Sequence, residues 1–181
     1  VTKGATPTTY GYQFLDEGIP FVKVENVKQG KIVNKSISCF ISDEANDKQS
    51  RSKLKPGDVL FSIAGTIGET CVVLKRDCPA NTNQALAIIR GTGLVLDADF
   101  LRLQLDSFVS LAVKAKARGG AMNNVSLGDL RHLPIVIPPL AEQKRIVAKV
   151  DQLMALCDEL ERRQKEGKET SLKLNEAALH E

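Results

Sequence analysis

The side chains that most often carry catalysis are scarce and poorly placed in this chain. Its two histidines are His132, in an expected turn, and His180, next to the last residue. Neither lies in a pattern that pairs it with a nucleophile or a metal, so a surface or structural role is expected. A nuclease-like Glu-x-Lys occurs only as Glu166-Gly167-Lys168, inside a heptad-patterned segment where no cleft is expected. The sequence therefore predicts no catalytic residue.

The glycines do not predict a phosphate-binding loop either. Those nearest to such a pattern are Gly65, Gly68, Gly91 and Gly93. The stretch GTGLVL lacks the third glycine of a dinucleotide-binding motif, and the acidic–Pro–Pro–aromatic motif of amino-methyltransferases does not occur. We expect no cofactor.

The cysteine spacing and the hydropathy indicate whether the chain has a metal site, a redox site or a membrane span. The four cysteines lack the paired spacing of zinc or redox sites and are expected to be inert free thiols, as in a reducing cytoplasm: Cys39, Cys71, Cys78 and Cys157. No apolar run approaches the roughly 20 residues of a membrane span, and no charged-then-apolar leader opens the chain. We expect no metal, no membrane and a cytoplasmic location.

The charges are distributed unevenly between the two ends of the chain. Residues 1–139 contain 17 Lys and Arg against 13 Asp and Glu, whereas residues 140–181 contain 8 against 9. A mildly basic body permits nucleic-acid binding without demonstrating it.

Short strands are expected through the first half of the chain. Turn residues such as Gln29-Gly30 and Pro56-Gly57-Asp58 separate apolar runs of the usual strand length. The expected strands are Ile19–Val24, Lys31–Val33, Val59–Ile63, Thr70–Leu74 and Ala85–Arg90. The polar residues 43–55 between them are expected to form a surface loop or a short exposed helix.

Helical periodicity replaces this pattern after Asp97. Six apolar residues recur at three- and four-residue steps: Phe100, Leu101, Leu105, Phe108, Leu111 and Ala112. Asp97 and Asp99 favour a helix start there, and Gly119-Gly120 ends it. Ser126 is expected to cap a short helix to Arg131, and Leu133–Ile137 is expected to be a strand.

After Pro138-Pro139 a heptad begins. Its seam consists of Ile146, Val150, Leu153, Cys157 and Leu160, weakens at Gln164 and Gly167, and resumes with Ser171, Leu174 and Ala178. A helix over residues 140–181 would be roughly 63 Å long. A surface helix packed on its own body is the alternative, but this length favours a partner helix. The expected architecture is α+β: a strand-rich domain with packed helices over 1–138, followed by a coiled-coil helix over 139–181.

These segments resemble one half of the specificity subunit of type I restriction–modification enzymes. Five stretches match in family order: Ile19–Val27, Leu54–Gly68, Asn81–Arg90, Arg118–Leu130 and Leu133–Leu160. The most specific is the PxxxPPLxEQxxIV-type junction, Pro134–Val147.

The resemblance implies a non-catalytic DNA reader. Such subunits have two recognition domains, each reading one part of a split target, held apart by two antiparallel spacer helices on which methyltransferase and restriction subunits dock. The second helix would come from another half-subunit or from a second copy, as a homodimer. The sequence has no initiating Met and stops within a helical pattern, which leaves open a fragment or a natural half-length subunit.

Polar side chains in loops are the expected contacts to double-stranded DNA, because amides pair with adenine edges, and Arg and Lys pair with guanine or phosphate. The candidates are Thr8, Thr9, Tyr10, Lys23, Asn26, Lys28, Asn81, Asn83, Gln84, Lys114, Lys116, Arg118, Asn123 and Asn124. For each, a turn-forming or solvated role competes with DNA contact. Two other functions remain open at this point: a coiled-coil assembly scaffold that does not read DNA, and the recognition portion of a larger fused DNA methyltransferase.

Overall fold

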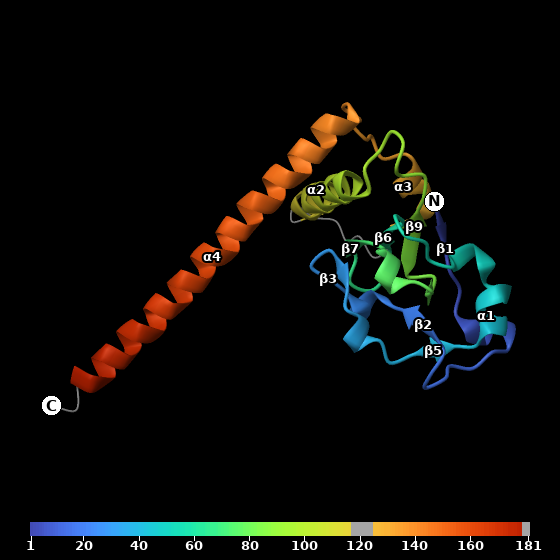
Figure 1. The fold of residues 1–181 in the computed structure, drawn as a ribbon, viewed down its shortest axis with the longest axis horizontal. Coiled ribbons are helices and arrows are strands. Elements are labelled where there is room, and N and C mark those ends of the chain that lie inside the picture. Colours follow the sequence, from blue (N-terminus) through green and yellow to red (C-terminus); the bar gives the residue numbers. More distant parts are fainter. Residues whose placement is uncertain (117–124, 179–181) are drawn as a thin grey trace. The chain divides into compact units, whose positions relative to one another are not determined.

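The structure is a computed structural model that describes residues 1–116 and 125–178 (Figure 1). Only the backbone of residues 109–116 and 169–178 is described. The strands are β1 (Thr2–Lys3), β2 (Ile19–Val22), β3 (Val27–Lys28), β4 (Lys31–Ile32), β5 (Phe40–Ile41), β6 (Val59–Ser62), β7 (Thr70–Val72), β8 (Asn81–Thr82) and β9 (Leu86–Ile89). The helices are α1 (Asp43–Lys48), α2 (Ala98–Lys116), α3 (Leu127–Arg131) and α4 (Leu140–Ala178). The α+β architecture is as the sequence predicts.

The larger sheet has the strand order β1-β9-β6-β7 and is antiparallel throughout. Its central strand β6 pairs Phe61 with Ala87 of β9 and with Thr70 of β7. All four residues of β6 are buried, because both faces of this sheet are covered. The three expected strands here are confirmed as β6, β7 and β9, each shorter than predicted.

The second sheet has the order β5-β2-β8, in which β2 is antiparallel to β5 and parallel to β8. Strand β2 ends at Val22, two residues earlier than expected, because the chain turns into a 3-10 helix, Val24–Asn26. The strands β3 and β4 form a separate hairpin. Consecutive strands β8 and β9 belong to different sheets, so the turn between them, residues 83–85, crosses from one sheet to the other.

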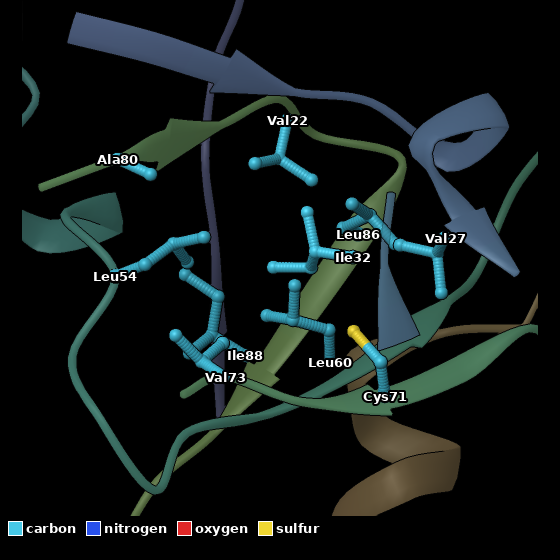
Figure 2. Close-up of a cluster of buried hydrophobic side chains, with 10 residues drawn as sticks. All are labelled: Val22, Val27, Ile32, Leu54, Leu60, Cys71, Val73, Ala80, Leu86 and Ile88. Carbon is cyan, nitrogen blue, oxygen red and sulfur yellow. The ribbon is translucent and has the colours of Figure 1, made fainter. Parts of the chain in front are cut away.

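Two of the apolar clusters meet at the larger sheet. Figure 2 shows the first, in which Leu60 of β6 meets side chains from the second sheet and the β3–β4 hairpin. On the opposite face of the larger sheet, Val59 and Phe61 pack against Leu101 and Leu105 of α2. The side chains of β6 therefore alternate between two clusters, as successive side chains of a strand must.

The polar stretch 43–55 is less exposed than expected. Ser42 caps α1 by accepting a hydrogen bond from the backbone N–H of Ala45 at 3.2 Å. Ala45 is fully buried against Phe21 and Ile41. The short helix is present and its charged side chains are exposed as predicted, but Ala45 and Asn46 on its inner face are buried. The sequence contains too few apolar residues here to show which face is buried.

Both predicted helix starts are confirmed. The side chain of Asp97 accepts a hydrogen bond from the N–H of Phe100 at 3.0 Å, at the start of α2. Ser126 and Asp129 form a reciprocal capping box at α3, with bonds of 2.9 and 3.0 Å.

The predicted strand Leu133–Ile137 is wrong. The segment has no regular secondary structure, and no described strand pairs with it. Its backbone bonds a side chain instead: the Gln104 amide donates to the carbonyl of Val136 at 3.0 Å and accepts from its N–H at 2.9 Å. Leu133 and Ile135 still pack on the α2 cluster, which explains the alternating pattern.

The chain separates into two compact units, Val1–Gln143 and Lys144–Glu181. We call the first the body; the second is the rest of α4, a single uninterrupted helix as far as Ala178. In the part of the chain that the structure describes, no helix is long and apolar enough to cross a membrane.

Candidate nucleic-acid interface

Two groups of predicted DNA contacts lie together on the body. Gly4 donates a backbone hydrogen bond to the carbonyl of Asn83 at 3.2 Å, and the hydroxyl of Thr6 donates to Oε1 of Gln84 at 2.9 Å. These bonds hold the N-terminal loop beside the crossover turn between β8 and β9. We call the resulting surface the polar rim; it consists of Thr8, Thr9, Tyr10, Asn83 and Gln84.

The close approach of the two rim segments requires a glycine at position 4. A Cβ added to Gly4 would lie 1.8 Å from the carbonyl oxygen of Thr82, which no backbone adjustment of a few tenths of an ångström would relieve. The rim therefore depends on a residue that the sequence pattern does not mark.

The N-terminal half of the rim is a short 3-10 helix, Pro7–Tyr10. Pro7 is buried at its start, where a missing N–H has no cost. Gly11 ends the helix with φ +82°, the left-handed conformation that glycine adopts readily. Thr8, Thr9 and Tyr10 are exposed as a result, and Tyr10 has 45% of its surface accessible.

The other half of the rim is the crossover turn. The side chain of Asn83 is occupied in it, because Oδ1 accepts a hydrogen bond from the N–H of Ala85 at 3.0 Å. Gln84 is exposed, and its Nε2 donates to no group among the described residues. Hydroxyls, a free amide donor and an exposed aromatic ring are groups that can bond base edges or stack on bases.

Two other residues predicted to contact DNA, Asn26 and Asn81, are buried in the body. Asn26 is 3% exposed; its Oδ1 accepts from the N–H of Lys23 at 2.8 Å, and its Nδ2 donates to the carbonyl of Ser36 at 2.8 Å. Asn81 is fully buried and donates to Oδ1 of Asn46 at 2.9 Å. Neither amide can reach a base in this structure, and both serve to hold loops.

The predicted lysines differ in how they are held. The ammonium group of Lys23 lies 3.0 Å from the sulfur of Cys39 and 5.1 Å from the ring centre of Phe14, so its side chain is folded onto the body. Lys28 is exposed at the end of β3. The side chains of Lys114 and Lys116, at the end of α2, lie outside the described residues, as do Arg118, Asn123 and Asn124 entirely.

The junction before α4 depends on a buried glutamine that sequence reasoning did not single out. Gln143 is fully buried. Its Oε1 accepts from the N–H of Asp97 at 2.7 Å, and its Nε2 donates to the carbonyls of Val95 and Pro138, both at 2.8 Å. One side chain thus joins the start of α2 to the first turn of α4. The position of Gln143 in the junction motif could have drawn attention to it, but the motif does not show that its side chain is buried.

The predicted seam of α4 is largely exposed. Leu153 and Leu160 have 49% and 56% of their surfaces accessible; Cys157 is exposed, and Ile146 and Val150 are half-buried. For Leu174 only the backbone is described. Met154 and Leu156, which flank the seam, are also 56% and 55% exposed. Sequence reasoning missed these two because it followed only the central seam positions.

The described thiols and acidic groups form no metal centre. Among residues 1–116 and 125–178, no cluster of three His, Cys, Asp or Glu side chains could hold a metal ion. Burial raises the pKa of the Cys71 thiol to about 12, with a further contribution from Asp77, so this thiol stays protonated and unreactive. Burial also raises the pKa of Cys78.

Comparison with known proteins identifies the family. The model of the type I restriction modification DNA specificity domain matches residues 1–168, which include the body and most of α4. The chain belongs to this family. The resemblance inferred from the five sequence stretches is thereby confirmed, and membership implies recognition of DNA.

Individual relatives agree with this assignment. Over 82% of its length, the chain is 28% identical to the EcoBI specificity subunit of Escherichia coli, of which it covers 31%. The crystal structure of the HsdS subunit from Thermoanaerobacter tengcongensis superposes with a TM-score of 0.68 at 26% identity, over 95% of this chain and 44% of that one. A structure described as the basis of complex assembly and conformational transition of the type I R-M system gives 0.66 at 25% identity, over 91% and 38%. The chain spans about a third of the length of the curated relatives it matches.

Proposed function

We propose that this chain is the DNA-reading part of a type I specificity subunit, which recognises one part of a split target and leaves the chemistry to partner subunits. The observation that carries the proposal is the match of a single family model, the type I specificity domain, over residues 1–168. This one match includes both the body and most of α4. Reading of cellular DNA would take place in the cytoplasm.

The polar rim supports the assignment of base reading to one surface of the body. Its exposed side chains, Thr8, Thr9, Tyr10 and Gln84, have donors, acceptors and a ring free to meet DNA. Because the rim contains no cation, it is suited to specificity rather than to bulk affinity. Arg118, Asn123 and Asn124 remain proposed contacts from the sequence alone.

The exposed apolar side chains support protein partners. We propose that α4 pairs with the antiparallel helix of a second half-subunit, or with that of a second copy, through Leu153, Leu160 and their neighbours. The body has further exposed apolar side chains at Leu94 (96%) and Val136 (73%). Such surface is suited to the docking of methyltransferase and restriction subunits.

Sequencing of methylated motifs in the source cells, with and without the gene, tests the function directly. We expect one split motif to lose its methylation when the gene is deleted and to regain it on complementation. An unchanged methylome in cells that express the partner subunits would contradict the proposal, and would favour the scaffold function. Methylation by a single longer gene product would favour the fused methyltransferase.

The purified chain tests the division of labour. It should bind duplex DNA with an affinity that falls as salt rises, and it should leave that duplex unmodified when incubated with a methyl donor alone. Turnover by the pure chain would disprove the non-catalytic assignment.

Single substitutions test the rim. Gln84→Ala and Tyr10→Ala should each weaken binding to the motif found in cells by about 1–3 kcal/mol while sparing random duplex. Gln152→Ala, an exposed glutamine on α4, is the control and should change neither. Equal losses for both duplexes would remove the rim from the base-reading surface.

A further inference from the structure

The β3–β4 hairpin presents two lysines that the fold itself does not use. Val27 pairs with Ile32 and Lys28 pairs with Lys31 across the two strands. The connecting residues Gln29 and Gly30 have φ values of +50° and +75°, as in the tight turns that suit a two-residue hairpin.

The two cross-strand pairs lie on opposite faces. Val27 and Ile32 are 1% and 8% exposed and belong to the cluster in Figure 2. Lys28 and Lys31 are both exposed on the other face. Cβ atoms of directly opposed residues are about 4.5–5.5 Å apart, and like charges at that separation destabilise a strand pair.

No acidic group of the described residues forms an ion pair with Lys28 or Lys31. Among the described residues, no ion pair offsets the repulsion between these two ammonium groups. An external anion bound between the two ammonium groups would remove it.

The hairpin is held firmly enough to position these cations. Its strands lie against β7, and Gly30 forms an isolated bridge with Cys71. A Cβ at Gly30 would be 3.2 Å from Nη1 of Arg102, so the turn rests against that side chain. Arg102 donates to Asp106 at 2.9 Å, and its own charge is thereby balanced.

We propose that the β3–β4 hairpin binds the phosphate backbone of duplex DNA through Lys28 and Lys31. The inference rests on the proposed function and adds a role that the polar rim lacks, since the rim contains no cation. Ammonium groups on flexible stems bind phosphates as point charges and carry no base information. The hairpin therefore contributes affinity that is independent of sequence.

Charge reversal of one lysine separates DNA binding from folding. Lys31→Glu replaces the like-charge pair by an opposite-charge pair, so the melting temperature should stay equal or rise. Affinity of the full chain for a random duplex should fall. The plot of log affinity against log salt should become shallower by about 0.9 for each phosphate that the variant no longer neutralises, and Lys28→Glu/Lys31→Glu should double that change.

Lys48→Glu is the matched control, because Lys48 is exposed on α1 and the change in net charge is identical. It should leave the salt slope unchanged. A slope that the hairpin variants also leave unchanged, while the parent binds duplex, overturns the phosphate contact and spares the proposed function. A slope flattened equally by Lys48→Glu, or a melting temperature that falls together with affinity in Lys31→Glu, also overturns it. A parent that binds no duplex at low salt overturns the proposed function and the hairpin together.

Discussion

In the body, the apolar side chains of the central strand β6 are enclosed; in α4, several large apolar side chains from Leu153 onward are exposed. Strand β6 places Val59, Leu60 and Phe61 at 0% exposure between two clusters. By contrast, Leu153, Met154, Leu156 and Leu160 of α4 are each about half exposed or more.

This difference indicates that the buried apolar residues of β6 are needed for folding, whereas the exposed ones of α4 are available for association with a partner. Enclosed apolar surface stabilises the unit that contains it, at roughly 25 cal/mol per Å². Exposed apolar surface on a long helix gains that stabilisation only when a partner covers it. Substitutions in the body should therefore act on folding, and those in the α4 seam should act on association.

The largest effect is expected from charges placed in the seam. Leu153→Lys/Leu160→Lys would bury unpaired ammonium groups in a paired helix, at a cost of several kcal/mol. The dissociation constant of the associated form should rise more than a hundredfold, as measured by sedimentation equilibrium. Leu94→Lys, at an exposed position on the body, is the control and should leave self-association unchanged. A parent that is monomeric at high concentration would contradict self-association of this chain.

A second comparison uses the same residue type in both units. Leu60→Ala should lower the free energy of unfolding of the body by about 2–5 kcal/mol, because it leaves a cavity between two sheets. Leu153→Ala should change that free energy by no more than about 0.5 kcal/mol. Urea denaturation at a concentration where the chain is monomeric measures both. Similar losses for the two variants would mean that α4 folds as part of the body core.

The junction is tested by removing the Gln143 amide. Gln143→Leu leaves the N–H of Asp97 and the carbonyls of Val95 and Pro138 without their partner, at a cost of about 2–4 kcal/mol. Gln104→Leu, which also removes an amide making two backbone bonds but at a more exposed site, should cost only about 0.5–1.5 kcal/mol. Thermal or urea unfolding ranks the two, and a reversed order would deny Gln143 its role at the junction.

The smallest effect is expected at the cap of α3. Ser126→Ala removes the bond to the N–H of Asp129 and should cost about 1 kcal/mol in unfolding free energy. The backbone N–H of Ser126, and then its hydroxyl, lower the pKa of Asp129. Stability from this carboxylate is present above its unfolded pKa and is lost as the pH falls through the lowered folded pKa. Part of the acid sensitivity should persist in Ser126→Ala, because the backbone bond remains; its complete loss would mean that the hydroxyl, and not the backbone N–H, lowers the pKa of Asp129.

The sequence predicted a helix correctly where its periodicity and its capping residues lie within the helix or at its ends. The three- and four-residue steps after Asp97, the Ser126 cap and the heptad after Pro139 each predicted a helix that is present. Periodicity and capping are properties of a few adjacent residues, so they can be recognised without knowledge of the fold.

The hydrogen-bond partner of each polar side chain could be identified only from the tertiary structure. Asn81 and Gln84 belong to one polar run, yet the first is buried in an internal bond and the second is exposed at the crossover turn. The segment Leu133–Ile137 has the alternation of a strand, but the Gln104 side chain makes both backbone hydrogen bonds of Val136. The sequence by itself determined helices α2, α3 and α4, strands β6, β7 and β9 of the larger sheet, the family resemblance and the apolar seam of α4. The tertiary structure alone decided which amides are free, because that depends on groups that lie far apart in the chain and meet only when it folds.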